Sequence, residues 1–185
     1  MSIPILLDAN CITYLLLGYK PKHKDWVILN TIIDEYSKSM AGYICQYLIT
    51  ERNPKEYDPL TSRVVEFLYD SVKMESKKRG MIIVRNNICI FRKIKALVRL
   101  SIEKIIGYER ILLDPFGEDY VPHIDCKPKK GNPLSTIDKK ILELATRCTY
   151  IAVTEDRGIL ECCNTLNIKN KCIYVRKFFT SRRMD

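Results

Sequence analysis

Acidic residues follow the apolar segments of this chain at positions where a parallel sheet would bring them together. Asp8 directly follows residues 3–7, an apolar run typical of a buried strand in a parallel sheet. Asp156 lies two residues beyond residues 150–154, a second predicted strand. Asp138 belongs to the first turn of the helix predicted just before that strand. Because ligands of such sheets bind at the carboxyl ends of the strands, we expect these acids to share one edge.

Glu51 is a fourth candidate, because it follows the short predicted strand at residues 41–45 after a brief connection. Four carboxylates at one edge would repel each other, and such a cluster is costly unless cations neutralise it. Hard oxygen ligands of this kind suit Mg²⁺ or Mn²⁺. The sequence therefore predicts a site for one or two divalent cations, held by Asp8, Glu51, Asp138 and Asp156.

Each of these acids also has a purely structural interpretation. Asp8 and Asp156 each precede a predicted helix, and either could cap the N-terminus of that helix. Ser135 and Asp138 have the spacing of a capping box. Glu51 could be a solvated surface acid, and two other acids could take its place, Glu56 and Glu66. The pattern formed by all four acids together, rather than any one of them, favours the metal site.

The elements that would position these acids alternate between strands and helices. Predicted strands lie at residues 3–7, 41–45, 111–114, 150–154 and 171–175, and predicted helices at 9–17, 25–38, 61–77, 92–106, 135–148 and 158–166. Residues 81–91 fit either a hairpin around Asn86 and Asn87 or the start of the next helix. The alternation predicts an α/β fold, a three-layer α/β/α sandwich with a central, mainly parallel sheet. We expect a single domain over residues 1–185, with a helical insertion around 60–133.

Composition narrows the classes of partner. The net charge of +9, from 31 Lys and Arg against 22 Asp and Glu, favours nucleic acid first and an anionic membrane second. The apolar runs are shorter than the about 20 residues that span a bilayer, and no secretory signal precedes them, so we expect a cytoplasmic protein. The 8 cysteines include no CxxC pair, so we expect no structural zinc. Buried thiols and disulfides both remain open for them.

Four segments resemble the sequence motifs of the PIN-domain family, whose members are mostly ribonucleases. The segments "ILLDANCITYLL", "LITERN", "LSTIDKKILELA" and "VTEDRGIL" resemble the first to fourth motifs in that order. They supply the residues that correspond to the family's site: Asp8, Asn10, Glu51, Thr50, Asp138, Thr154 and Asp156. The long stretch between the second and third segments has no such motif, which leaves the substrate and the partners open.

The resemblance implies a metal-dependent endoribonuclease that hydrolyses phosphodiester bonds of single-stranded RNA by a two-metal-ion mechanism. The four acids would hold the ions, and three supporting residues would orient them: Asn10, Thr154 and Glu155. A homodimer, an antitoxin or an RNA-processing complex is an expected partner. The alternatives are a non-catalytic nucleic-acid-binding or scaffold protein with the same fold, and an unrelated α/β interaction module that binds no metal.

Clusters of Lys and Arg indicate where nucleic acid would bind. The candidates lie on the predicted helix at 92–106, in a long loop at 116–133 and in the C-terminal tail. They are Arg92, Lys93, Lys95, Arg99, Lys127, Lys129, Lys130, Arg176 and Lys177, with Arg182 and Arg183 further along the tail. Three aromatic residues could stack on unpaired bases: Tyr120, Phe178 and Phe179. A solvated basic face is the structural alternative for each cluster.

Overall fold

The computed structural model describes residues 3–52, 58–117, 119–129 and 132–180, and the chain divides into two compact units. The sheet unit comprises residues 1–32 and 109–185, and the helical unit comprises residues 33–108. The helical unit is therefore inserted into the sequence of the sheet unit. The single domain over residues 1–185 with a helical insertion around 60–133 stays a prediction.

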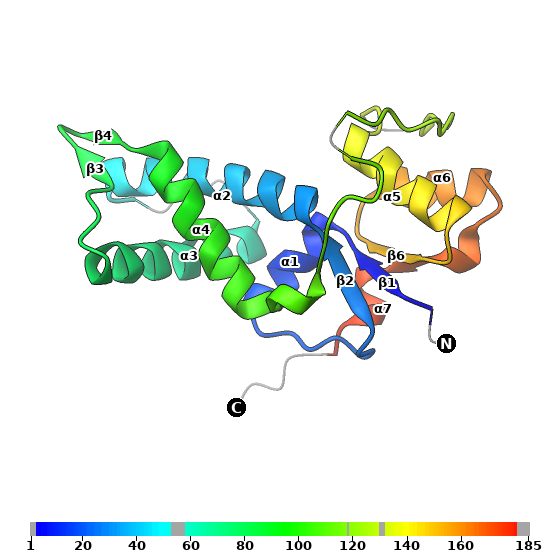
Figure 1. The fold of residues 1–185 in the computed structure, drawn as a ribbon, viewed down its shortest axis with the longest axis horizontal. Coiled ribbons are helices and arrows are strands. Elements are labelled where there is room, and N and C mark those ends of the chain that lie inside the picture. The colour runs from blue at the N-terminus through cyan, green and yellow to red at the C-terminus, as the bar shows by residue number, and fades with distance from the viewer. Residues whose placement is uncertain (1–2, 53–57, 118, 130–131, 181–185) are drawn as a thin grey trace. The chain divides into compact units, whose positions relative to one another are not determined.

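The sheet unit contains five parallel strands in the order β5-β2-β1-β6-β7 (Figure 1). The strands are β1 (Ile5–Leu7), β2 (Trp26–Leu29), β5 (Ile111–Leu112), β6 (Ile151–Thr154) and β7 (Cys172–Tyr174). From the central strand β1, the chain first builds outward through β2 and β5 and then crosses to β6 and β7. The strand order therefore reverses between β1 and β6, which is the point where ligands bind in open α/β sheets.

The central strand explains why helices must cover this sheet. All three residues of β1 are buried, and a strand buried on both faces requires other elements against both of them. The helices of the sheet unit are α1 (Ala9–Leu16), α5 (Thr136–Arg147), α6 (Arg157–Thr165) and α7 (Val175–Phe178). Over the described residues of the whole chain the fold is α/β, with one five-stranded parallel sheet and seven α-helices, an arrangement compatible with a three-layer sandwich.

The helical unit is built from three long helices and a hairpin. These elements are α2 (Asn30–Thr50), which starts in the last residues of the sheet unit, α3 (Pro59–Lys78), β3 (Val84–Arg85), β4 (Ile88–Cys89) and α4 (Phe91–Ile106). The hairpin turn contains Asn86 and Asn87 with φ of 50° and 58°, as its two-residue geometry requires. The structure thus decides between the two interpretations of residues 81–91 in favour of the hairpin.

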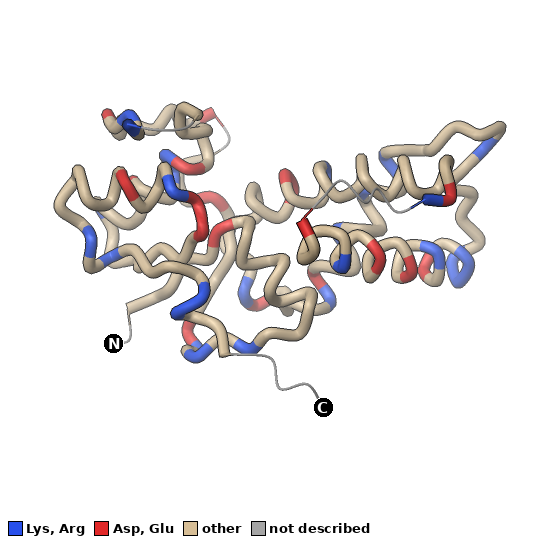
Figure 2. Tube along the Cα trace, turned by 180° about the vertical axis from the view of Figure 1, so that it is seen from behind, with Lys and Arg blue, Asp and Glu red and all other residues tan. Residues whose placement is uncertain are grey.

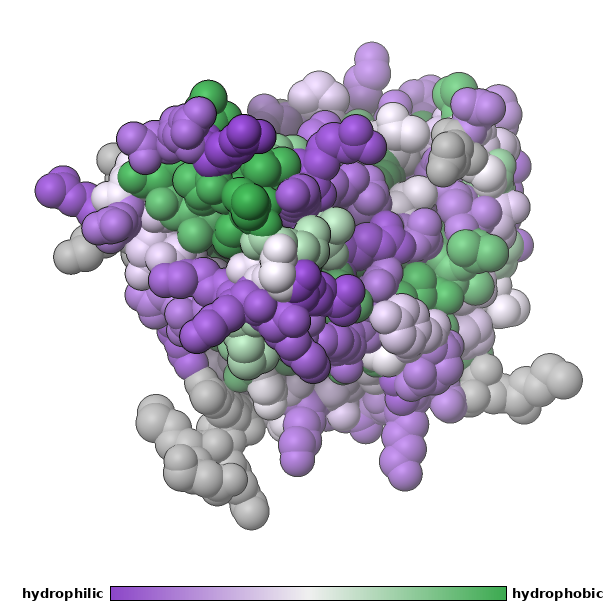
Figure 3. Space-filling view, turned by 60° about the vertical axis from the view of Figure 1, so that its left-hand side comes forward, coloured by the Kyte–Doolittle hydropathy of each residue, from purple (hydrophilic) through white to green (hydrophobic). Residues whose placement is uncertain are grey.

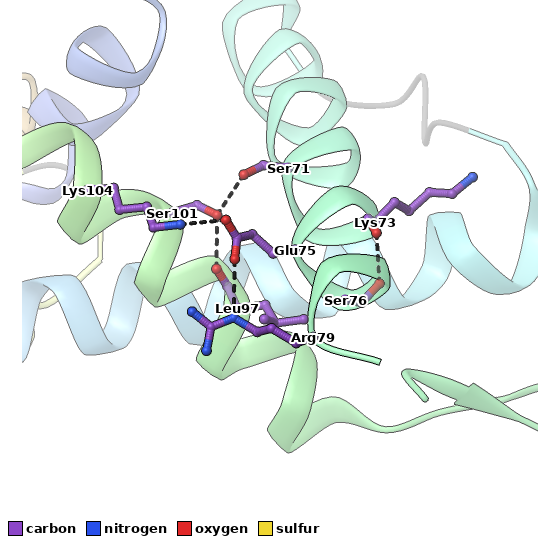
Figure 4. A network of polar contacts seen from close by, with 8 residues as sticks. All are labelled: Ser71, Lys73, Glu75, Ser76, Arg79, Leu97, Ser101 and Lys104. Carbon is purple, nitrogen blue, oxygen red and sulfur yellow. Dashed lines mark hydrogen bonds and ion pairs between the residues drawn. The ribbon is translucent and has the colours of Figure 1, made fainter. Parts of the chain in front are cut away.

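Polar contacts connect α3 with α4 inside the helical unit (Figure 4). Ser71 Oγ and Ser101 Oγ lie 2.7 Å apart. The Glu75 carboxylate, which is largely buried, accepts hydrogen bonds from Arg79 Nε at 3.2 Å and from Lys104 Nζ at 2.5 Å. The cations at these positions therefore neutralise an acid of their own unit.

The surface of the helical unit is partly apolar. Residues around the hairpin expose the side chains of Ile82, Ile88 and Phe91. Figure 3 shows hydrophobic areas of this kind in green among hydrophilic side chains. A disulfide between Cys45 of α2 and Cys89 of β4 fixes the hairpin to the helix.

Two predicted elements are wrong. Residues 41–45, expected as a strand, lie inside α2. Residues 25–38, expected as one helix, divide into the strand β2 and the first part of α2. The reason is the same in both places, because a short apolar run has no periodicity long enough to distinguish a strand from a buried helical turn. Within the described residues, no helix combines the length and apolar character that crossing a bilayer requires.

Candidate functional site

Asp8 lies at the carboxyl end of β1 and caps the N-terminus of α1. Its Oδ1 accepts a hydrogen bond from the Ala9 backbone N–H at 2.6 Å, and its Oδ2 accepts one from the Thr154 hydroxyl at 2.6 Å. Only 5% of the residue is exposed. Asp8 is therefore fixed in position by contacts from both sides of the strand reversal.

Asp156 follows β6 and caps α6. Its Oδ1 accepts a hydrogen bond from the Ile159 N–H at 3.0 Å, and its own N–H donates to Thr154 Oγ1 at 2.9 Å. The fully buried hydroxyl of Thr154 thus donates to Asp8 and accepts from Asp156. One side chain at the end of β6 sets the positions of both acids.

Asp138 belongs to the capping box predicted at the start of α5. Its Oδ2 accepts from the Ser135 N–H at 2.8 Å, while its own N–H donates to Ser135 Oγ at 3.1 Å. The side chain is half-buried. Because α5 leads directly into β6, the first turn of α5 stands near the carboxyl edge of the sheet.

Asp138 and Asp156 both act electrostatically on Asp8. Burial raises the pKa of Asp8 from 3.8 to about 6, although its hydrogen bonds to Thr154 and Ala9 act in the opposite direction. The negative charges of Asp138 and Asp156 add to the increase in this pKa. We call Asp8, Asp138 and Asp156 the acid group. The sheet assembles it at the reversal of strand order between β1 and β6.

The other residues predicted for the site have different surroundings. Glu51 follows α2 with φ of 54°, is exposed and belongs to the helical unit, so the sheet does not position it. Asn10 is exposed in the first turn of α1. Glu155 is half-buried and accepts a hydrogen bond from the Tyr174 hydroxyl at 3.2 Å, with Arg176 Nε at 4.0 Å.

The acid group has the donor chemistry for a hard divalent cation, but its side chains serve as helix caps. In the described parts of the chain, no group of three or more His, Cys, Asp and Glu side chains is arranged to hold a metal ion. Each carboxylate oxygen has two lone pairs, so one capping hydrogen bond leaves acceptor capacity.

Two buried charged residues on α5 were not predicted from the sequence. Lys140 Nζ donates to Asp114 Oδ2 at 2.6 Å and to the Gly117 carbonyl at 2.9 Å, and both side chains of this ion pair are almost fully buried. Charged residues on an amphipathic helix are expected at the solvent face. The spacing did contain a signal, because Lys140 lies three residues from Ile137 and four from Leu144, on the apolar face.

Glu143 is the second of these residues. It is fully buried and accepts hydrogen bonds from the Tyr120 hydroxyl at 2.8 Å and the His123 N–H at 3.3 Å. Arg147 Nη1 lies 2.9 Å from the same carboxylate. Lys140 and Glu143 therefore hold the loop that precedes α5 against that helix.

The predicted nucleic-acid contacts fall into three groups. On α4, Lys95 and Arg99 pair with Asp34 at 2.8 and 3.4 Å, and Lys93 Nζ donates to the Ile82 carbonyl at 3.0 Å. Basic and acidic positions are interleaved along the helices of this unit rather than gathered in one stripe (Figure 2). The exposed candidates are Arg92, Lys127, Lys129, Arg176 and Lys177. Three candidates lie outside the described residues: Lys130, Arg182 and Arg183.

The predicted aromatic contacts with bases are wrong for two of three residues. Phe178 and Phe179 are only 1% and 4% exposed, so their rings cannot stack on a base. Phe179 instead stacks on Tyr14, with ring centroids 5.3 Å apart. Tyr120 is half-buried and stacks on Phe116 at 4.5 Å.

A separate hollow of about 380 Å³ lies at the other end of the strands, before β1 and β2 begin. Arg110 lies over the Trp26 ring at 4.1 Å and donates to the carbonyls of Lys24 and Trp26 at 2.7 and 3.1 Å. The Arg110 guanidinium is therefore already occupied by contacts within the protein. The acid group is therefore the stronger candidate for function.

Comparison with known proteins finds no matching family model, no similar curated protein and no similar solved structure. Function must accordingly be argued from the geometry of the acid group and its surroundings.

Proposed function

We propose that this protein is a metal-dependent nuclease with a PIN-like three-layer sandwich, and that it cleaves single-stranded RNA internally. The observation that carries the proposal is the acid group itself. Asp138 and Asp156 both lie within electrostatic reach of Asp8 at the strand reversal, and burial and these two neighbouring charges keep the pKa of Asp8 raised to about 6. A divalent cation would stabilise the ionised form of Asp8, which burial and the two neighbouring charges disfavour.

The acid group would hold one or two Mg²⁺ or Mn²⁺ ions, with Glu51 as a fourth ligand proposed from the sequence alone. A bound ion lowers the pKa of its water and offsets the charge of the scissile phosphate. The chain's own contribution is positional. Thr154 fixes the Asp8 carboxylate through its hydroxyl and fixes the Asp156 backbone through its oxygen, so both acids keep one orientation.

Cleavage of a labelled single-stranded RNA in the presence of Mn²⁺ tests this proposal. We expect Asp8→Asn and Asp156→Asn to lower the rate by more than about 100-fold, since each removes a charge that would bind the ion. Asp125→Asn is the matched control, because Asp125 is an exposed acid of the same unit outside the acid group. Equal rates for all four proteins would indicate a contaminating nuclease and refute the assignment.

A second candidate is a nucleic-acid-binding protein that does not cleave. It is favoured by a specific observation, because all three acids already serve as helix caps or capping-box members. This function predicts RNA binding that is independent of metal, with no cleavage by the wild type. The same assay therefore separates the two candidates.

A further inference from the structure

Residues 126–129 lie against α6 between Gly158 and Cys162, and we call this segment the strap. A disulfide joins Cys126 to Cys162 of α6. Three residues further along the strap, the Lys129 N–H donates to Glu161 Oε1 at 3.0 Å. A covalent bond and a hydrogen bond thus hold the two ends of the strap on one helix.

The middle of the strap reaches the acid group. A Cβ added to Gly158 would stand 3.2 Å from Pro128 Cγ and 3.0 Å from Asp156 Oδ1. The proline ring and the carboxylate therefore meet over the same glycine in the first turn of α6. The strap lies immediately beside one of the three acids of the proposed nuclease site.

Burial alternates along the strap. Cys126 is buried and Pro128 is half-buried, whereas Lys127 and Lys129 are exposed. Residues 126 and 128 face α6, and the two lysines that alternate with them lie on the solvent side. The ammonium groups are thus presented on the outer side of a fixed backbone.

The strap lysines differ from several basic residues of the helical unit. Lys95, Arg99 and Lys104 each pair with an acid of their own unit. Among the residues that the structure describes, neither Lys127 nor Lys129 takes part in an ion pair. Two unneutralised cations beside a group of acids favour a ligand that carries repeated negative charges.

We propose that the strap is the phosphate-binding element that holds a single-stranded polynucleotide beside the acid group, with Lys127 and Lys129 as its contacts. This inference rests on the proposed nuclease function. The phosphodiester backbone is the recognised chemistry, and RNA and DNA are its two sources. Because the disulfide holds the strap in place before binding, little conformational entropy is lost when the strand docks.

The salt dependence of binding tests the strap directly. The full-length Asp8→Asn protein in EDTA is titrated with a labelled single-stranded RNA or DNA oligonucleotide at several salt concentrations. Lys127→Gln combined with Lys129→Gln should weaken binding several-fold and reduce the slope of log K against log salt by about 1.4, since each phosphate contact on a single strand contributes about 0.7. Lys77→Gln combined with Lys78→Gln is the matched control, because it removes the same charge from exposed positions of α3.

The outcomes separate the strap from the nuclease assignment. A reduced slope for the strap variant alone supports the strap, and the oligonucleotide that binds more tightly identifies the substrate. An unchanged slope, or an equal loss in the control, overturns the strap even if Asp8-dependent cleavage is observed. Conversely, a reduced slope in a protein that never cleaves retains the strap and refutes the nuclease.

A second variant tests whether binding depends on the position of the two lysines as well as on their charge. Replacing both Cys126 and Cys162 with Ser releases the strap and leaves Lys127 and Lys129 unchanged. With folding verified by circular dichroism, we expect the slope to fall toward that of the double Gln variant. A slope equal to that of the tethered protein would overturn the claim that α6 positions these lysines.

Discussion

Asp8 combines two roles with opposite electrostatic requirements. As the cap of α1 it accepts hydrogen bonds that favour its ionised form, yet burial and two neighbouring acids favour its neutral form. Burial is the largest of these effects, and the pKa rises to about 6. A residue whose charge costs stability is more typical of a functional site than of a helix cap.

The raised pKa makes a prediction for stability without metal. The folded protein holds the Asp8 proton more tightly than the unfolded chain does. The stabilisation that this proton gives to the folded state is therefore fully present below pH 3.8 and is lost as pH rises through about 6. Asp8→Asn keeps a good cap but removes the charge. Chemical denaturation in EDTA should therefore show stabilisation at pH 8, up to about 3 kcal/mol, and little change near pH 4.

Asp58 is the matched control for that experiment. It caps α3 in an exposed position, and its hydrogen bond from the Thr61 hydroxyl holds the pKa of its carboxyl below the ordinary value. Its contribution is present at neutral pH and is lost on acidification, so Asp58→Asn should destabilise the protein at pH 8. If Asp8→Asn destabilised the protein in the same way, Asp8 would be an ordinary cap.

Gly158 gives a second prediction at the scale of one residue. Alanine at this position would place a methyl group 3.0 to 3.2 Å from Asp156, Leu134 and Pro128, so at least one of them must move. We expect Gly158→Ala to lower the proposed RNA cleavage strongly while the melting temperature changes little. Gly42→Ala in α2 is the control, because the added methyl group has no atom within 4 Å apart from its chain neighbours and the nearby backbone of its own helix, and helix propensity should raise stability by about 1 kcal/mol. Full activity of Gly158→Ala would show that the strap and Asp156 need no fixed spacing.

At the scale of elements, helix α5 buries charged side chains. Lys140 and Asp114 form a buried ion pair that fastens the segment after β5 to this helix. Removing one partner of such a pair leaves an uncompensated charge in a poorly solvated position. Removal of one partner should therefore change the free energy of unfolding more than replacement of the whole pair does.

A double-mutant cycle measures this effect. Lys140→Met should lower the free energy of unfolding by about 3–5 kcal/mol, because Asp114 then stays buried without a cation. The double variant Lys140→Met with Asp114→Leu should recover most of that loss, because an apolar pair replaces the ion pair. Denaturant titrations of the wild type, both single variants and the double variant give the coupling. If the losses of unfolding free energy in the two single variants added up in the double variant, the two side chains would not interact.

The elements also show how far the sequence could be interpreted. The strands that precede Asp8 and Asp156 and the helix that carries Asp138 were predicted, because apolar runs that end beside an acid and a capping box mark them locally. Residues 41–45 and 25–38 were predicted wrongly, because a short apolar run fits both structures. The strap beside Asp156 had no local signal, since the pairing of Cys126 with Cys162 cannot be deduced from a single sequence.

At the scale of the whole molecule, each disulfide stays within one unit. Cys45–Cys89 closes the helical unit, and Cys126–Cys162 and Cys163–Cys172 both lie in the sheet unit. Each cross-link therefore restricts the unfolded ensemble of one unit only. Removal of one disulfide should accordingly destabilise mainly the unit that contains it.

Hydrogen exchange can test that separation. Replacing Cys45 and Cys89 with Ser opens a loop with a sequence separation of 44, which should cost about 4 kcal/mol and reduce amide protection mainly in residues 33–108. Replacing Cys163 and Cys172, with a separation of 9, should cost less and affect the sheet unit. An equal loss of protection in both units after either replacement would show that the chain unfolds as one cooperative block.

The position of the helical unit in the sequence has a consequence for how this protein can change over time. The unit is inserted between β2 and β5, which are paired neighbours in the sheet. A parallel crossover between neighbouring strands needs only about a dozen residues, and here it has grown into a compact body with its own disulfide. Exchange, shortening or duplication of this segment by recombination would leave the register of all five strands intact. The acid group could thus persist while the inserted body acquired new specificities.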